Sequence, residues 1–147
     1  MSMSLKDFLI NKNYISVKLK KIATNHFEIK AKINGKKGRF ILDTGASNSC
    51  VGFDEIEKFK LKTEVSEHKA AGAGPEEIDT QISKKNNIKI GDFKIKKVPL
   101  VLIDLSHINN ALTKQDAKPV NGIIGADVLD EGNAIIDYKK RKLYLCK

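Results

Sequence analysis

The chain has 147 residues, of which 41% are hydrophobic and 31% are charged, and its formal net charge is +9. This length allows one domain with a substantial core and excludes two large domains, and the balance of residues is that of an ordinary globular protein. The two cysteines, Cys50 and Cys146, show neither a metal-ligand spacing nor a disulfide framework, so we expect free thiols.

Residues 1–13 are predicted to be an N-terminal extension, and residues 14–147 to be the folded domain. Leu5, Phe8 and Leu9 favour a short amphipathic helix within the extension. The first ten residues lack an apolar run long enough for a signal peptide, and no segment reaches transmembrane length. We therefore expect a cytoplasmic protein without a membrane partner.

Alternating apolar and polar residues predict two half-buried strands, over 14–20 and 26–33. Asn34-Gly35 follows, which is the strongest short-range signal for a hairpin, and the chain returns through 39–42. The next segment, 53–61, has apolar residues at helical spacing and acidic residues near its start, so it predicts a short helix.

The remaining chain is also predicted to be mostly β. The expected strands are 65–71, 78–83, 88–90, 93–105, 120–124, 134–137 and 142–146. The segment 107–118 is polar and is either a short helix or a loop, and 126–130 is a turn or short helix. This pattern predicts a mostly β fold, most simply a small closed barrel with one or two short helices.

Asp43 begins the pentapeptide Asp43-Thr44-Gly45-Ala46-Ser47, directly after the apolar strand end Phe40-Ile41-Leu42. A buried charge is costly unless it is paired, so a carboxylate is rarely placed at the end of such a strand for packing alone. The plain alternative is a turn aspartate that caps the loop. The motif occurs once, because Asp79-Thr80 is followed by Gln81 instead of glycine.

Three features, in this order, resemble the retropepsin-like aspartic proteases: the D-T-G-A motif at Asp43, the small-residue tip at 71–74, and the apolar segment ending in Gly125. The resemblance implies an acid-protease barrel in which Asp43 is catalytic. It implies that the catalytic loop is supported by Thr44, Gly45, Ala46, Ser47, Ile123, Ile124 and Gly125, and that the flap over the substrate is Ala71, Gly72, Ala73 and Gly74. From its residues alone, the 71–74 tip fits a plain hairpin equally well.

In that family, two neighbouring carboxyl groups share one proton and activate a water molecule, one as general base and the other as general acid. This chain supplies one such aspartate. The resemblance therefore implies an aspartic endopeptidase that forms a twofold homodimer, with one Asp43 from each copy, acting on a peptide or protein substrate. It implies no metal and no organic cofactor.

Two alternatives stay open. The fold could serve as a dimerisation or peptide-binding module without turnover, or the positive charge could indicate a basic nucleic-acid-binding β domain. The charge is almost entirely lysine spread along the strands, and Arg39 and Arg141 are the only arginines. Because base recognition favours the planar guanidinium group, this composition argues against nucleic acid as the partner.

Overall fold

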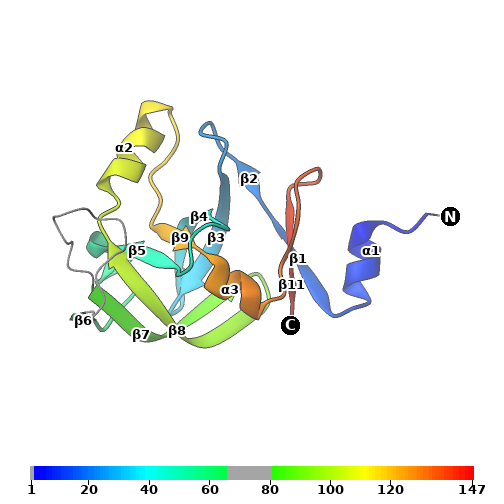
Figure 1. The fold of residues 1–147 in the computed structure, drawn as a ribbon, viewed down its shortest axis with the longest axis horizontal. Coiled ribbons are helices and arrows are strands. Elements are labelled where there is room, and N and C mark those ends of the chain that lie inside the picture. Colours follow the sequence, from blue (N-terminus) through cyan, green and yellow to red (C-terminus); the bar gives the residue numbers. More distant parts are fainter. Residues whose placement is uncertain (1, 66–80) are drawn as a thin grey trace.

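The computed structural model describes residues 2–65 and 81–147 (Figure 1). The expected flap residues 71–74 lie outside the described residues. The helical elements are α1 (Leu5–Ile10), the 3-10 turn η1 (Phe53–Glu55), α2 (Ser106–Lys114) and α3 (Ala126–Glu131). The strands are β1 (Tyr14–Lys18), β2 (Lys20–Lys21), β3 (Phe27–Ile33), β4 (Lys36–Leu42), β5 (Cys50–Gly52), β6 (Glu64–Val65), β7 (Gln81–Ile90), β8 (Phe93–Ile103), β9 (Gly122–Ile124), β10 (Ile135–Asp137) and β11 (Lys142–Cys146).

Six strands form a closed barrel in the order β3-β4-β9-β5-β8-β7. The ring closes because β7 pairs with β3, with Lys32 opposite Lys89 and Ile33 opposite Ile88. The short strands β2 and β6 extend the ends of this sheet, and a second sheet has the order β1-β11-β10. Closure leaves the six strands without free edges. The predicted mostly β closed barrel with short helices is therefore confirmed.

The barrel core follows from the alternation of apolar and polar residues along each strand. On β3, Phe27, Ile29, Ala31 and Ile33 are all buried, whereas Lys30 lies on the outside. Each large side chain buried in this way stabilises the fold by about 1.5–3 kcal/mol. The period-two pattern therefore determines which face of each strand packs inside.

The hairpin between β3 and β4 turns at Asn34 and Gly35, as the sequence predicts. Both residues have positive φ, +51° and +84°, which a two-residue hairpin of this kind requires. Asn34 also ties the turn to the barrel, because its Nδ2 donates to the carbonyl oxygen of Phe59 at 2.8 Å and its Oδ1 accepts the N–H of Asn87 at 3.0 Å.

Two of the predicted elements are wrong in extent. The segment 53–61 is not one helix: η1 ends at Glu55 and a series of turns follows, with Lys60 at φ +54°. This path places the ring of Phe59 against that of Phe40, with 6.0 Å between centroids, and core packing overrides the helical spacing.

The strand predicted at 88–90 is instead the end of the long strand β7. The register of β7 against β8 shifts between Ser83 and Asn86. At this irregularity, the Nδ2 atom of Asn86 donates hydrogen bonds to the carbonyl oxygens of Ser83 and Val98. The polar segment after β8 is a helix, α2. In the described part of the chain, no helix combines the length and the apolar character needed to cross a membrane.

Candidate active site

Asp43 lies where β4 ends and the chain turns. Its backbone N–H donates to the carbonyl oxygen of Ile124 at 2.9 Å, which holds it against β9. Its carboxylate Oδ1 accepts the N–H of Gly45 at 2.9 Å, and its carbonyl oxygen accepts the N–H of Ala46 at 3.2 Å. Asp43 is half-buried, whereas Thr44 and Gly45 are exposed. Backbone hydrogen bonds thus hold the carboxylate at the rim of the barrel.

Strand β9 supports this loop from behind. It runs parallel to β4, with Ile41 opposite Ile123 and Leu42 opposite Ile124, and antiparallel to β5. Ile123 and Ile124 are buried. Two residues after β9, at the start of α3, the N–H of Ala126 donates to the carbonyl oxygen of Ala46 at 2.7 Å. Hydrogen bonds to Ile124 of β9 and to Ala126 of α3 therefore hold the loop near both of its ends.

Gly125 allows the loop to approach β9 closely. A Cβ atom at this position would lie 2.5 Å from the carbonyl oxygen of Ala46 and 3.2 Å from its carbonyl carbon. A Cβ atom this close would clash with the carbonyl group of Ala46, which cannot move away because it is hydrogen-bonded to Ala126. A residue without a side chain is needed here for the Ala46–Ala126 hydrogen bond to form.

Ser49 and Asp127 connect the far end of the loop to α3. The hydroxyl of Ser49, which is fully buried, donates to Asp127 Oδ1 at 2.7 Å and accepts the N–H of Gly125 at 2.9 Å. The N–H groups of Ser49 and Val128 donate to the same carboxylate, at 3.0 and 2.9 Å. Hydrogen bonds to an ionised carboxylate are short and strong, so this network fixes the loop relative to α3.

Cys50 follows directly and begins β5. Burial, followed by the nearby charges of Asp127 and Asp43, raises the pKa of the Cys50 thiol from its ordinary 9.0 to about 11. The thiol is consequently protonated at neutral pH, and a protonated thiol is a poor nucleophile. This environment argues against a cysteine nucleophile beside Asp43.

The structure brings together most of the residues selected from the sequence. The loop 43–47 and the segment 123–125 are far apart in the chain and lie in direct hydrogen-bonded contact. The positions 71–74 lie outside the described residues. Sequence reasoning did not identify Ser49 as a site residue, because one serine and one aspartate so far apart form no recognisable pattern.

The site residues lie within a segment that matches a protein family. The family model described as aspartyl protease matches residues 29–128, about two thirds of the chain. No curated protein sequence matches the chain significantly.

The solved structures that share the fold include three proteases or protease-like domains. A retropepsin-like aspartic protease from Rickettsia conorii has a TM-score of 0.57 and 20% identity, and the match covers 90% of this chain and 89% of that one. The retroviral protease-like domain of Ddi1 from Leishmania major has a TM-score of 0.53 and 17% identity, covering 80% and 86%. The EIAV protease in complex with the inhibitor HBY-793 has a TM-score of 0.53 and 21% identity, covering 75% and 90%.

Proposed function

This chain belongs to the aspartyl protease family, and we propose that it is an aspartic endopeptidase whose active site is completed by a second copy of the chain. The observation that carries the proposal is the placement of Asp43. Its carboxylate is oriented by the Gly45 N–H at the end of a buried strand, and the loop is hydrogen-bonded to Ile124 of β9 and to Ala126, the first residue of α3. The two ion pairs among the described residues, Arg39–Glu28 and Lys84–Glu64, lie outside this loop.

Hydrolysis of a peptide bond without a metal or a covalent intermediate requires a general base and a general acid at the same time. In the proposed dimer, ionised Asp43 takes a proton from a water molecule while the water oxygen attacks the carbonyl carbon. Protonated Asp43 of the partner subunit donates its proton to the carbonyl oxygen, which gives a tetrahedral diol. The C–N bond of the diol then breaks as the proton that Asp43 took from water passes to the leaving amine nitrogen. The two carboxyl groups share one proton, because like charges at close range cannot both ionise easily.

The exposed tip of the loop supports the dimer. Thr44 and Gly45 are exposed although they lie beside buried strands, so this surface is open to a second copy. We propose that Thr44 hydrogen-bonds to the loop of the partner and keeps the two carboxyl groups in register. Exposed apolar side chains on and beside α1, including Phe8 and Ile10, offer further surface to bury in an assembly.

The proposal is tested with Asp43→Asn, and Asp130→Asn, an exposed aspartate on α3, serves as the matched control. Cleavage of fluorescently labelled casein is followed for each protein. Asp43→Asn is expected to lower the rate by a factor of at least about 10², since it removes both the acid and the base, whereas the control keeps the parent rate. Equal cleavage by parent and Asp43→Asn would refute the mechanism.

Subunit mixing tests whether both copies contribute. If the copies exchange freely, one equivalent of Asp43→Asn reduces parent activity to about half, and a ninefold excess reduces it to about a tenth. Sedimentation velocity over a range of concentrations reports the mass directly. A fully active monomer would refute the shared site. Peptide binding without cleavage by the parent would favour the non-catalytic binding module.

A further inference from the structure

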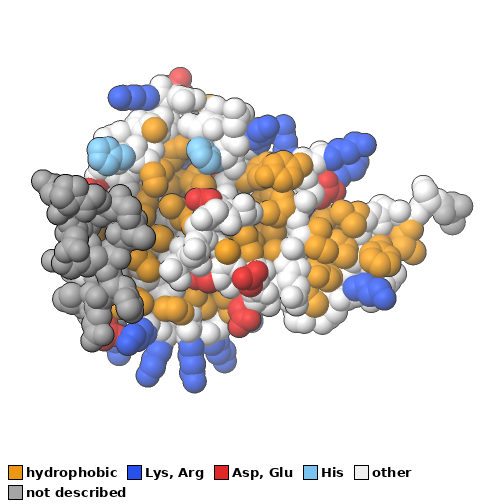
Figure 2. Space-filling model, viewed as in Figure 1, with side chains coloured by type: hydrophobic (Ala, Val, Ile, Leu, Met, Phe, Trp, Pro, Cys, Tyr) orange, Lys and Arg blue, Asp and Glu red, His pale blue; other side chains and the backbone are white. Residues whose placement is uncertain are grey.

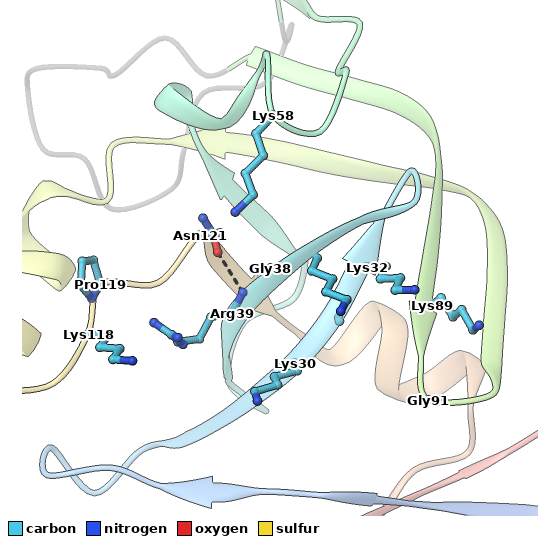
Figure 3. Close-up of a pocket in the computed structure, with 12 residues that line it drawn as sticks. Lys30, Lys32, Gly38, Arg39, Lys58, Lys89, Gly91, Lys118, Pro119 and Asn121 are labelled. Atoms are coloured by element: carbon cyan, nitrogen blue, oxygen red, sulfur yellow. Dashed lines mark hydrogen bonds between the residues drawn. The ribbon is translucent and has the colours of Figure 1, made fainter.

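A basic groove lies on the outside of the barrel, at the opposite end of β4 from Asp43. Its volume is about 740 Å³. Its cationic lining consists of Arg39 and six lysines: Lys30, Lys32, Lys37, Lys58, Lys89 and Lys118. Figure 3 shows Arg39 and Lys118 extended toward one another, with Lys32 and Lys89 beside each other on neighbouring strands. Among the described residues that line the groove, none is acidic and none is aromatic.

The strand register gathers lysines into a row. Lys37 on β4 lies opposite Lys32 on β3, Lys32 lies opposite Lys89 on β7, and Lys89 lies opposite Lys94 on β8. A second like-charged pair, Lys30 and Arg39, lies on the same face of β3 and β4. Like charges directly opposite each other destabilise a sheet, so this arrangement carries a cost that a bound anion would offset.

The groove keeps most of its positive charge. Arg39 is partly neutralised by Glu28, whose carboxylate is buried and lies 2.7 Å from the Arg39 Nε. In the described ranges, the ion pairs do not include any of the six groove lysines. Separately from the groove, Figure 2 shows Lys and Arg side chains gathered along the lower edge of one face, over β7 and β8. The field of the groove favours a ligand with a high density of negative charge.

We propose that the groove binds a compact oligophosphate, such as a free polyphosphate or the phosphate chain of a nucleotide. Neighbouring strands are about 4.8 Å apart, so the row presents ammonium groups closely enough to meet consecutive phosphates. Lysine binds phosphate as a point charge and requires no fixed orientation of the anion. The volume is that of a small-molecule site, which is typically about 300–1,000 Å³.

Two larger polyanions fit the groove less well. A single-stranded nucleic acid would gain most from aromatic side chains on which bases stack, and the described lining offers none. An acidic peptide would gain most by adding a strand to a free edge, but β3 is paired with β4 on one side and with β7 on the other. The groove therefore favours a compact ligand that needs only charge and space.

The test is isothermal titration calorimetry of the full chain with inorganic tripolyphosphate at low and physiological salt. The central pair of the row is removed in Lys32→Gln/Lys89→Gln. The control is Lys18→Gln/Lys142→Gln, which removes an equally opposed lysine pair from the β1–β11 sheet and the same net charge. We expect saturable binding to the parent, about tenfold weaker binding to the groove variant, and less than a twofold change in the control. Affinity falls as salt rises.

Each contrary result overturns the proposal. Failure of the parent to bind tripolyphosphate removes the site, and equal weakening in both double variants would assign the binding to net charge alone. A hexaglutamate peptide or a deoxyribonucleotide oligomer that binds more tightly than tripolyphosphate, and loses affinity in the groove variant, would replace the compact ligand with a macromolecule. Circular dichroism of both variants verifies folding. The binding does not depend on cleavage, and repeating the titration with Asp43→Asn separates this inference from the proposed function.

Discussion

The hydroxyl of Ser49 is expected to be essential for the stability of the candidate catalytic loop. Ser49→Ala removes a charge-assisted hydrogen bond to Asp127, at 2.7 Å, and leaves the buried N–H of Gly125 without its acceptor. The first loss is worth about 1.5–3 kcal/mol, and an unsatisfied buried donor costs about 1–3 kcal/mol. Both losses involve the same hydroxyl oxygen, so the two energies do not add fully. We therefore expect the free energy of unfolding to fall by about 3 kcal/mol.

Urea denaturation followed by circular dichroism measures this change. The matched control is Ser47→Ala, an exposed serine in the same loop, which is expected to stay within about 0.5 kcal/mol of the parent. The melting temperature of Ser49→Ala should fall by roughly 6–12 °C for a domain of this size. If Ser49→Ala and Ser47→Ala unfold at the same urea concentration with the same slope, the network does not stabilise the loop and the reasoning is wrong.

Three further predictions concern the loop, its neighbour and the hairpin. Gly125→Ala forces a Cβ to within 2.5 Å of the Ala46 carbonyl oxygen, so we expect a loss of at least about 2 kcal/mol in urea denaturation; an unchanged midpoint would show that the loop relaxes freely. The Cys50 thiol, with its pKa raised to about 11, should be alkylated by iodoacetamide at pH 8 roughly 100-fold more slowly than a model thiol, as measured by mass spectrometry. Alkylation as fast as that of the model thiol would contradict the burial argument. Because the pKa of this thiol is higher in the folded state than its unfolded value of 9.0, its contribution to stability is complete below pH 9.0 and is lost as pH rises through about 11. Asn34→Gly tolerates positive φ and removes only the side-chain hydrogen bonds of the turn, so it should cost about 2 kcal/mol, and a cost below about 0.5 kcal/mol would mean that the turn backbone alone defines the hairpin.

Local patterns predicted the strands well. The alternation on β3 and the Asn34-Gly35 turn both depend on residues within a few positions of one another, so the sequence contains the whole signal. The helix predicted over 53–61 is wrong because its apolar residues serve different contacts, and Phe59 packs on Phe40 of another element. Spacing along one segment cannot reveal a partner supplied by another.

The residues of the candidate site likewise fall into two groups, those with a signal in the sequence and those without one. Asp43 stands out because a carboxylate directly after an apolar strand end is an unusual local arrangement, whereas the roles of Gly45 and of the segment ending in Gly125 follow from the resemblance to retropepsin-like proteases. Ser49 was not selected, because its importance comes from Asp127, which lies 78 positions away in the chain. A buried serine and an exposed one look the same in a sequence.

Short-range chemistry in the sequence thus determined where strands run, where they turn and which acid stands at a strand end, because alternation and turn preferences act between near neighbours. Tertiary structure alone decided that β7 closes the barrel on β3, that Ser49 anchors the loop to α3, and that lysines from four strands share one row. These features arise from strand register and packing between distant segments, and a one-dimensional pattern does not encode them in any single window.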